Sequence, residues 1–91
     1  GADIIMIKPG LPYLDIVRLV KDKFKVPTFT YQVSGEYTML KTLSLTGACS
    51  EAQTVLEALF SMRRAGADAI FTYYALQAAD WLCEYPYFPE C

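Results

Sequence analysis

The chain has 91 residues, of which 54% are hydrophobic and 20% are charged, so it is expected to fold around a modest core as at most one domain. Its 8 basic and 10 acidic residues give a net charge of −2, which argues against nucleic-acid binding because such proteins carry a basic surface. No apolar run approaches the roughly 20 residues that a membrane helix needs, and no targeting signal is recognised.

The first strand–helix unit is predicted from a continuous apolar run at residues 4–7, which is typical of a strand buried on both faces. Lys8-Pro9-Gly10 then ends the strand and forces a turn. Residues 13–23 carry apolar side chains at helical spacing, and Pro12 suits the first turn of that helix.

The second unit begins with β-branched and aromatic residues at positions 28–33, which predict a strand that Ser34-Gly35 breaks. A helix is expected at residues 36–45. A second helix should run to Arg64, with Ser50 as its N-cap and Gly66 as its C-cap.

The third unit is predicted as a strand at residues 69–74 and a helix at residues 76–84, followed by an irregular tail at 85–91 that contains two prolines. Alternating strands and helices are typical of a parallel α/β architecture. Three strands cannot close a (β/α)₈ barrel of about 250 residues, so a barrel would leave about five units outside this chain. A small open sheet of three strands is the alternative.

The three cysteines, Cys49, Cys83 and Cys91, are odd in number and have no CxxC spacing. They are interpreted as unpaired thiols in a reducing compartment. Because the chain has no histidine and its cysteines are isolated, no metal site is predicted within it.

Functional-looking side chains follow all three predicted strands: Lys8 after the first, Tyr31 and Ser34 near the end of the second, and Tyr73 with Tyr74 at the end of the third. The carboxyl ends of parallel neighbouring strands meet at one edge, where α/β proteins place their chemistry. These side chains are therefore expected to converge.

Lys8 is the most suggestive of them, because it follows an apolar run and precedes Pro-Gly. Burial at the mouth of a hydrophobic layer would favour the uncharged amine, the form that attacks a carbonyl. A lysine extending from a strand end into solvent is the ordinary alternative. Likewise, Ser34 could bind an anion at a helix start or form an ordinary turn, and Tyr73 could offer a hydroxyl or simply pack.

Three segments resemble the porphobilinogen synthase (5-aminolevulinate dehydratase) family. Residues 6–15, Met-Ile-Lys-Pro-Gly-Leu-Pro-Tyr-Leu-Asp, resemble its active-lysine segment. Residues 31–37, Tyr-Gln-Val-Ser-Gly-Glu-Tyr, resemble its substrate-carboxylate loop, and residues 63–68 followed by 72–74 resemble its final strand. In this order they cover residues 1 to about 84, so the chain resembles the C-terminal part of the family.

The resemblance implies that residues 1–84 form the last three strand–helix units of a (β/α)₈ TIM barrel, incomplete in this chain, with 85–91 as a tail. It also implies a lyase that condenses two molecules of 5-aminolevulinate into porphobilinogen in tetrapyrrole biosynthesis. Lys8 matches the lysine that forms a Schiff base at the P site. Ser34 and Tyr73 match residues that bind the substrate carboxylate, and Tyr31 matches a tyrosine of the same pocket.

The family's other active-site lysine and its metal ligands would lie upstream of this chain, so zinc or magnesium is expected there and no cofactor is expected on this segment. The chain alone should hold one substrate half-site and should not complete the condensation. The resemblance further implies homo-oligomers, octamers in the family, or association with the remainder of the barrel, in the cytoplasm or a plastid.

Two other functions remain open at this point. The chain could be a non-catalytic remnant of the barrel that serves as a structural or interaction subunit. It could also belong to another Schiff-base barrel, such as a class I aldolase, although the Tyr-Gln-Val-Ser-Gly-Glu segment disfavours this.

Overall fold

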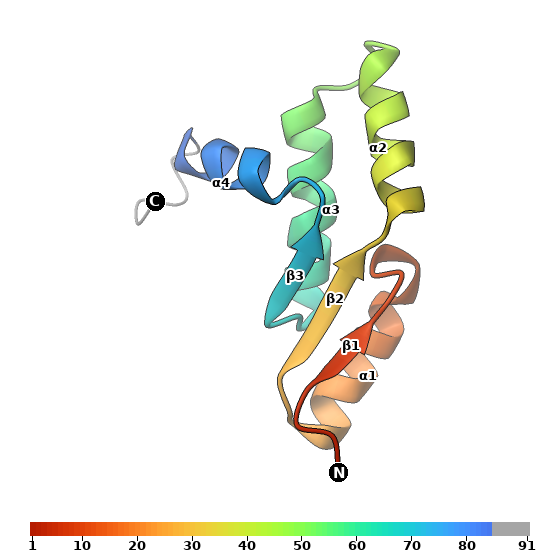
Figure 1. Ribbon diagram of the computed structural model, residues 1–91, viewed down its shortest axis with the longest axis vertical. Coiled ribbons are helices and arrows are strands. Elements are labelled where there is room, and N and C mark those ends of the chain that lie inside the picture. Colours follow the sequence, from red (N-terminus) through yellow and green to blue (C-terminus); the bar gives the residue numbers. More distant parts are fainter. Residues whose placement is uncertain (85–91) are drawn as a thin grey trace.

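Three parallel strands form the sheet of this protein, whose computed structural model describes residues 1–84. The strands are β1 (Ile5–Ile7), β2 (Thr28–Gln32) and β3 (Ala69–Thr72), in the spatial order β1-β2-β3 (Figure 1). Ile7 pairs with Thr30, and Tyr31 pairs with Phe71. The predicted parallel α/β arrangement is thus confirmed, whereas the prediction for residues 85–91 lies outside the described residues.

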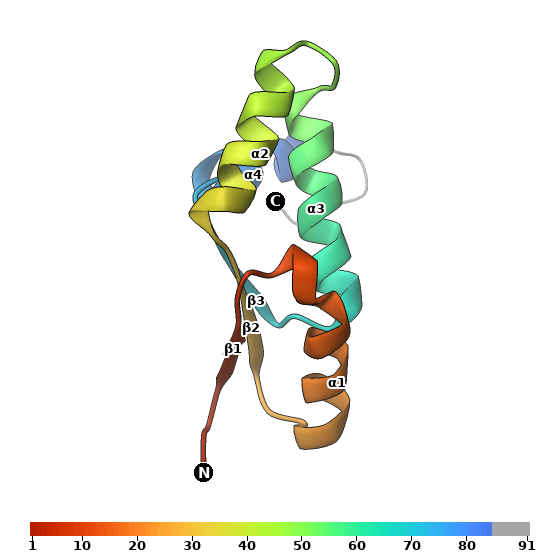
Figure 2. The ribbon, with the colours of Figure 1, turned by 90° about the vertical axis from the view of Figure 1, so that its right-hand side faces the viewer.

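Helices connect the strands and cover one face of the sheet. A 3-10 turn (Leu11–Tyr13) leads into α1 (Leu14–Phe24), and β2 is followed by α2 (Ser34–Leu45) and α3 (Glu51–Ala65). The last helix is α4 (Ala75–Glu84). Figure 2 shows α1 and α3 on one side of the sheet and no helix on the other, while the α2–α3 hairpin projects beyond the strand ends. None of the described helices is long and apolar enough to cross a membrane.

Both predicted caps of α3 are confirmed. The Ser50 hydroxyl accepts a hydrogen bond of 3.4 Å from the backbone N–H of Gln53, which satisfies one donor of the first turn. Gly66 ends the helix with φ 119°, in the left-handed region that glycine adopts without the cost that a Cβ adds.

Two element boundaries differ from the prediction by two residues, while several others shift by one. Helix α2 starts at Ser34 rather than at residue 36, because the Glu36 side chain accepts a hydrogen bond from the Val33 N–H and caps the helix from within. Strand β3 ends at Thr72 rather than at residue 74, because the Thr72 hydroxyl accepts a bond from the Tyr74 N–H and turns the chain.

The core lies between the sheet and the helices, and its buried apolar members are Val17, Val55, Leu56, Leu59, Met62, Ala67, Tyr74 and Ala78. The side chains that β2 turns toward the helices are polar: Thr28, Thr30 and Gln32. Their buried side-chain atoms all have hydrogen-bond partners, as do those elsewhere in residues 1–84. The sheet therefore avoids the cost of unpaired buried polar groups.

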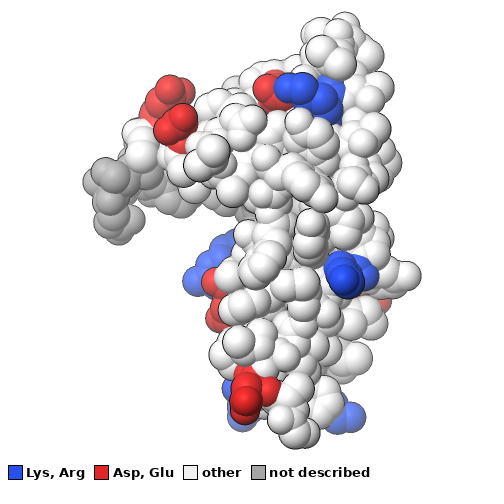
Figure 3. All heavy atoms as spheres, viewed as in Figure 1, with Lys and Arg blue, Asp and Glu red and all other residues white. Residues whose placement is uncertain are grey.

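The opposite face of the sheet is aromatic and uncovered within the described residues. Phe29 and Phe71 lie side by side with ring centroids 5.9 Å apart, and Tyr31 follows at 6.2 Å from Phe71. Phe71 is 46% exposed. Figure 3 views this face, where uncharged side chains occupy most of the surface over the sheet. An apolar surface of this kind is typical of a face that packs against further structure.

At the amino-terminal ends of the strands, Asp68 links helix α1 to strand β2. Its Oδ2 atom accepts a bond of 2.6 Å from Lys21 Nζ and one of 2.9 Å from the Thr28 N–H. The Asp68 N–H in turn donates to the Thr28 carbonyl at 2.8 Å. The hydrogen bond from Lys21, followed by that from Thr28, lowers the pKa of Asp68.

Replacing Asp68 by Asn should cost stability in a pH-dependent way. A lowered pKa in the folded state stabilises the protein fully above the unfolded value of about 3.9, and this contribution disappears as the pH falls through the folded value. Thermal denaturation of both proteins should therefore show a gap in melting temperature that is constant from pH 7 to 5 and shrinks below pH 4. A gap that stays the same down to pH 2 would contradict the linkage.

Candidate functional site

The predicted site residues lie at the carboxyl end of the sheet. Lys8 directly follows β1, Tyr31 belongs to β2, Ser34 is the first residue of α2, and Tyr73 directly follows β3. Because the strands are parallel neighbours, these positions share one edge, as predicted. The structure brings Tyr31 and Tyr73 into direct contact. Among residues 1–84, no side-chain hydrogen bond or ion pair joins Lys8 or Ser34 to them.

Of the two interpretations of Lys8, the described residues agree with a lysine that extends from the strand end into solvent, because its side chain is exposed. Lys8 follows the edge strand β1, and the neighbouring sheet face has no layer packed on it. The apolar run before Lys8 correctly predicted a strand, but it carried no information on what covers the strand's far face.

Tyr31 and Tyr73 form a hydroxyl pair. Tyr31 Oη donates to Tyr73 Oη at 3.3 Å, and the two rings meet edge to face with centroids 6.2 Å apart. This hydrogen bond raises the pKa of Tyr31, which keeps its phenol protonated. Since Tyr73 accepts from Tyr31, its own proton is available for another acceptor, and its side chain is 56% exposed. Both tyrosines line a hollow of about 410 Å³ beside β3.

Hydrogen bonds on either side of Tyr73 fix its position. Thr72 Oγ1 donates to Gln32 Oε1 at 2.6 Å and accepts the Tyr74 N–H at 3.0 Å. Tyr74 itself is fully buried, and its hydroxyl donates to Glu51 Oε2 at 3.1 Å. Burial is the main cause that raises the pKa of Tyr74. The adjacent tyrosines thus divide into a buried anchor, Tyr74, and an exposed hydroxyl, Tyr73.

Glu51 extends this anchoring to the α2–α3 hairpin. Its Oε2 atom also accepts a bond of 2.9 Å from Lys41 Nζ, which is the largest cause that lowers the pKa of Glu51. One carboxylate oxygen therefore contacts α2 and the turn after β3 while belonging to α3. Sequence reasoning assigned no such role to Glu51.

Glu36 is a residue of the site that sequence reasoning missed. Glu36 is only 5% exposed. Oε2 accepts the Val33 N–H at 2.8 Å and the Gly10 N–H at 3.2 Å, and Oε1 accepts the Leu11 N–H at 2.9 Å. Its place three residues after Val33 is the capping-box position, which was the available signal.

Gly10 allows the loop after Lys8 to pack closely on β2 and α3. Its N–H donates to the Tyr31 carbonyl at 2.9 Å as well as to Glu36. A Cβ at this position would lie 3.1 Å from Met62 Cε and 3.3 Å from Thr30 Cβ. Glycine is needed here for space, because its φ of −70° suits any residue.

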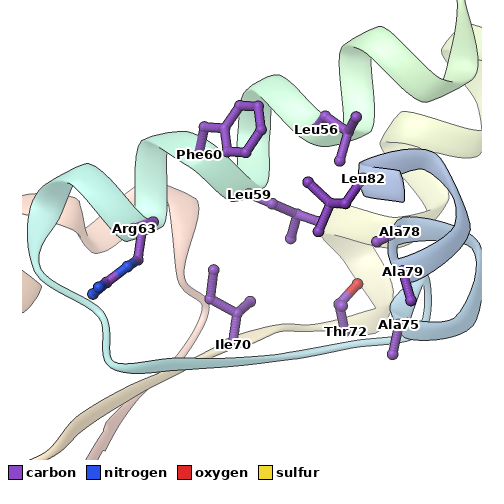
Figure 4. Close-up of a pocket in the computed structure, with 10 residues that line it drawn as sticks. All are labelled: Leu56, Leu59, Phe60, Arg63, Ile70, Thr72, Ala75, Ala78, Ala79 and Leu82. Atoms are coloured by element: carbon purple, nitrogen blue, oxygen red, sulfur yellow. The ribbon is translucent and has the colours of Figure 1, made fainter. Parts of the chain in front are cut away.

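A second hollow, of about 390 Å³, lies between α3, α4 and β3. Figure 4 shows Leu56, Leu59 and Phe60 of α3 on one side of it and the alanines of α4 on the other. Its lining is almost wholly apolar and includes none of Lys8, Tyr31, Ser34 or Tyr73.

The part of the chain that the structure describes contains no group of three or more His, Cys, Asp or Glu side chains that could hold a metal ion. Cys49 and Cys83 are free and exposed. The donor set of these residues therefore does not fit a resident metal, and no chemical step is assigned to one.

Known proteins resemble this chain in both sequence and fold. A sequence model of the family "Delta-aminolevulinic acid dehydratase" matches residues 1–81. The chain belongs to the delta-aminolevulinic acid dehydratase family. This confirms the resemblance found in the sequence, since the family is the one also called porphobilinogen synthase.

Two plant members illustrate the relation. The chloroplastic delta-aminolevulinic acid dehydratase of Physcomitrium patens and enzyme 1 of Arabidopsis thaliana are each 55% identical to the chain over 83 residues. In both cases the match covers 91% of this chain but 19% of the relative. The chain thus spans about a fifth of the length of these family members.

A solved structure of the family matches the fold. The delta-aminolevulinic acid dehydratase (porphobilinogen synthase) of Toxoplasma gondii, in complex with the reaction product porphobilinogen, superposes with a TM-score of 0.88 at 57% identity. The match covers 92% of this chain and 24% of that protein. The three parallel strands and their helices therefore have the arrangement of the corresponding part of this family's fold.

Replacing Gly10 by Ala should destabilise the protein by about 1–3 kcal/mol, because the added methyl group meets the fully buried Met62 and strand β2. Gly35→Ala is the matched control, since a Cβ there meets nothing within 4 Å and the position is helical. Urea denaturation should show a loss for the first variant and no loss or a gain for the second. Equal stability of the two variants would contradict the tight fit at Gly10.

Proposed function

We propose that this chain carries one substrate half-site of a porphobilinogen synthase, an enzyme that condenses two molecules of 5-aminolevulinate into porphobilinogen. The observation that supports this most strongly is the 0.88 TM-score and 57% identity to the product-bound Toxoplasma gondii enzyme. The sequence-predicted residues Lys8, Tyr31, Ser34 and Tyr73 add to it by lying at one edge of the sheet.

In this proposal, the three units are the last three of a (β/α)₈ barrel. Two features of the fold support it. The uncovered aromatic face of Phe29 and Phe71 is of the kind that fills a barrel interior, while the helices on the other face form the outer ring. In addition, β1 and β3 each have a neighbouring strand on one side only within residues 1–84, which leaves edges for further strands.

Lys8 is proposed as the nucleophile. Its uncharged amine adds to the ketone of 5-aminolevulinate, loss of one water molecule leaves a neutral imine, and uptake of one proton from solvent protonates the imine nitrogen. The protonated imine withdraws electrons from the neighbouring carbon atoms and so eases removal of a proton there. The exposure of Lys8 in the described residues leaves its amine accessible.

The hydroxyls of Ser34 and Tyr73 are proposed to bind the carboxylate of the same substrate molecule. Ser34 starts α2, where the helix dipole and free backbone N–H groups favour an anion. Tyr73 accepts a hydrogen bond from Tyr31, so its own proton can point at a carboxylate oxygen. The imine to Lys8 and the hydrogen bonds to the carboxylate together hold the substrate in one orientation for the reaction.

The remaining requirements of the reaction are proposed to come from outside this chain. These are the second substrate site and the zinc or magnesium ion, for which the described residues offer no ligand cluster. The chloroplastic relatives support a plastid location rather than a cytoplasmic one. Assembly into homo-oligomers stays a prediction.

Borohydride trapping tests the proposed function. The complete protein that carries this chain is incubated with 5-aminolevulinate and borohydride, then analysed by intact mass and peptide mapping. We expect a reduced adduct on Lys8, because borohydride converts the imine into a stable amine. Lys8→Ala should lose this adduct, and the control Lys23→Ala, at the far end of α1, should keep it. A folded protein without an adduct on Lys8 would favour the non-catalytic remnant instead.

A further inference from the structure

Glu36 is the one charged side chain that is buried among residues 1–84. Burying a carboxylate costs several kcal/mol unless hydrogen bonds replace its lost water. No ion pair of the described residues includes Glu36; instead, three backbone N–H groups donate to its two oxygens. Hydrogen bonds to a charged acceptor are about twice as strong as those between neutral groups. The three hydrogen bonds therefore hold the Glu36 carboxylate strongly to the backbone groups that donate them.

The three donors come from the two loops that carry the proposed site. Gly10 and Leu11 follow Lys8 by two and three residues and contact Glu36 across sequence separations of 26 and 25. Val33, the third donor, directly precedes Ser34. A single carboxylate thus joins the loop of the proposed nucleophile to the turn of the proposed carboxylate ligand.

Helix capping alone does not account for this arrangement. The bond to the Val33 N–H is what an acidic residue at the third helical position supplies. The bonds to Gly10 and Leu11 reach outside the helix, to the loop after β1. Leu11 is 40% exposed and Tyr13 is 47% exposed, so these two side chains hold the loop only in part. Besides the close fit of Gly10 against Met62 and Thr30, the loop is held by the polar contacts at Glu36 and by the bond from Gly10 to the Tyr31 carbonyl.

We infer that Glu36 is a positioning residue for the reaction, which sets the distance between the Lys8 amine and the Ser34 hydroxyl by bonding both of their loops. The inference rests on the proposed function of Lys8. Glu36 contacts no substrate in this account. It acts through the backbone of Gly10, Leu11 and Val33.

The variant Glu36→Gln separates positioning from folding. A glutamine has only one acceptor oxygen, which can replace either Oε2, the acceptor for Val33 and Gly10, or Oε1, the acceptor for Leu11. Its NH₂ group then faces each remaining backbone N–H and cannot accept from it. The side chain keeps its volume. Asp68→Asn is the matched control, because it makes the same carboxylate-to-amide change at a residue that also bonds a backbone N–H, that of Thr28, at the opposite end of the strands.

The measurement is the rate of borohydride-trapped adduct formation on Lys8 in the complete protein, at saturating 5-aminolevulinate and well below the melting temperature of each variant. We expect Asp68→Asn to react within about twofold of the unmodified protein. Glu36→Gln should react about tenfold more slowly or worse, because small displacements of a reacting group have large effects on rate. Glu36→Ala, which removes all three bonds, should be slower still.

The outcomes distinguish the two proposals. If the unmodified protein forms no adduct on Lys8, the proposed function fails. If it forms the adduct and Glu36→Gln reacts as fast as Asp68→Asn, the proposed function stands and the positioning role of Glu36 is refuted. If neither Glu36 variant folds, the residue serves the fold itself and the positioning inference is likewise overturned.

Discussion

The arrangement of the sheet's carboxyl edge depends on one buried carboxylate. Glu36 collects three backbone donors from two loops that are about 25 residues apart in sequence. This contact brings the loop after β1 against the start of α2. Gly10 favours this contact, since a Cβ at its position would crowd Met62 and Thr30. Separate hydrogen bonds position the third strand at the same edge. The Thr72 hydroxyl donates to Gln32 and accepts from the Tyr74 N–H, which fixes the turn that carries Tyr73.

The two faces of the sheet have different chemistry, and the proposed site lies where their edge is open. One face turns Thr28, Thr30 and Gln32 toward the helices, and every buried side-chain polar atom of residues 1–84 is paired. The other presents aromatic rings that nothing covers within residues 1–84. Lys8 borders this second face, so its surroundings in the working protein would depend on what packs there. The chain spans about a fifth of the length of its relatives.

The sequence allowed the elements to be predicted because their signals are local. The cap at Ser50, the left-handed glycine at Gly66 and the apolar run before Lys8 each act over a few residues. The capping-box position indicates the bond between Glu36 and Val33, but the bonds of Glu36 to Gly10 and Leu11 and those of Asp68 to Lys21 and Thr28 join residues 25 to 47 positions apart, and no local pattern indicates them. The choice between a buried and an exposed Lys8 stayed open for a related reason, since a strand's sequence does not say which of its faces has a partner. The sequence also did not indicate that Tyr74 is buried and Tyr73 exposed, because this difference follows from the turn that Thr72 stabilises.

The most direct test of the account is a crystal structure of the complete protein after borohydride reduction in the presence of 5-aminolevulinate. If Lys8 forms the imine, continuous density should run from Lys8 Nζ into the substrate chain. The substrate carboxylate should lie within hydrogen-bonding distance of Ser34 Oγ and Tyr73 Oη. Glu36 should retain its bonds to the Gly10, Leu11 and Val33 N–H groups. A substrate bound through another lysine alone, or a carboxylate held away from Ser34 and Tyr73, would contradict it.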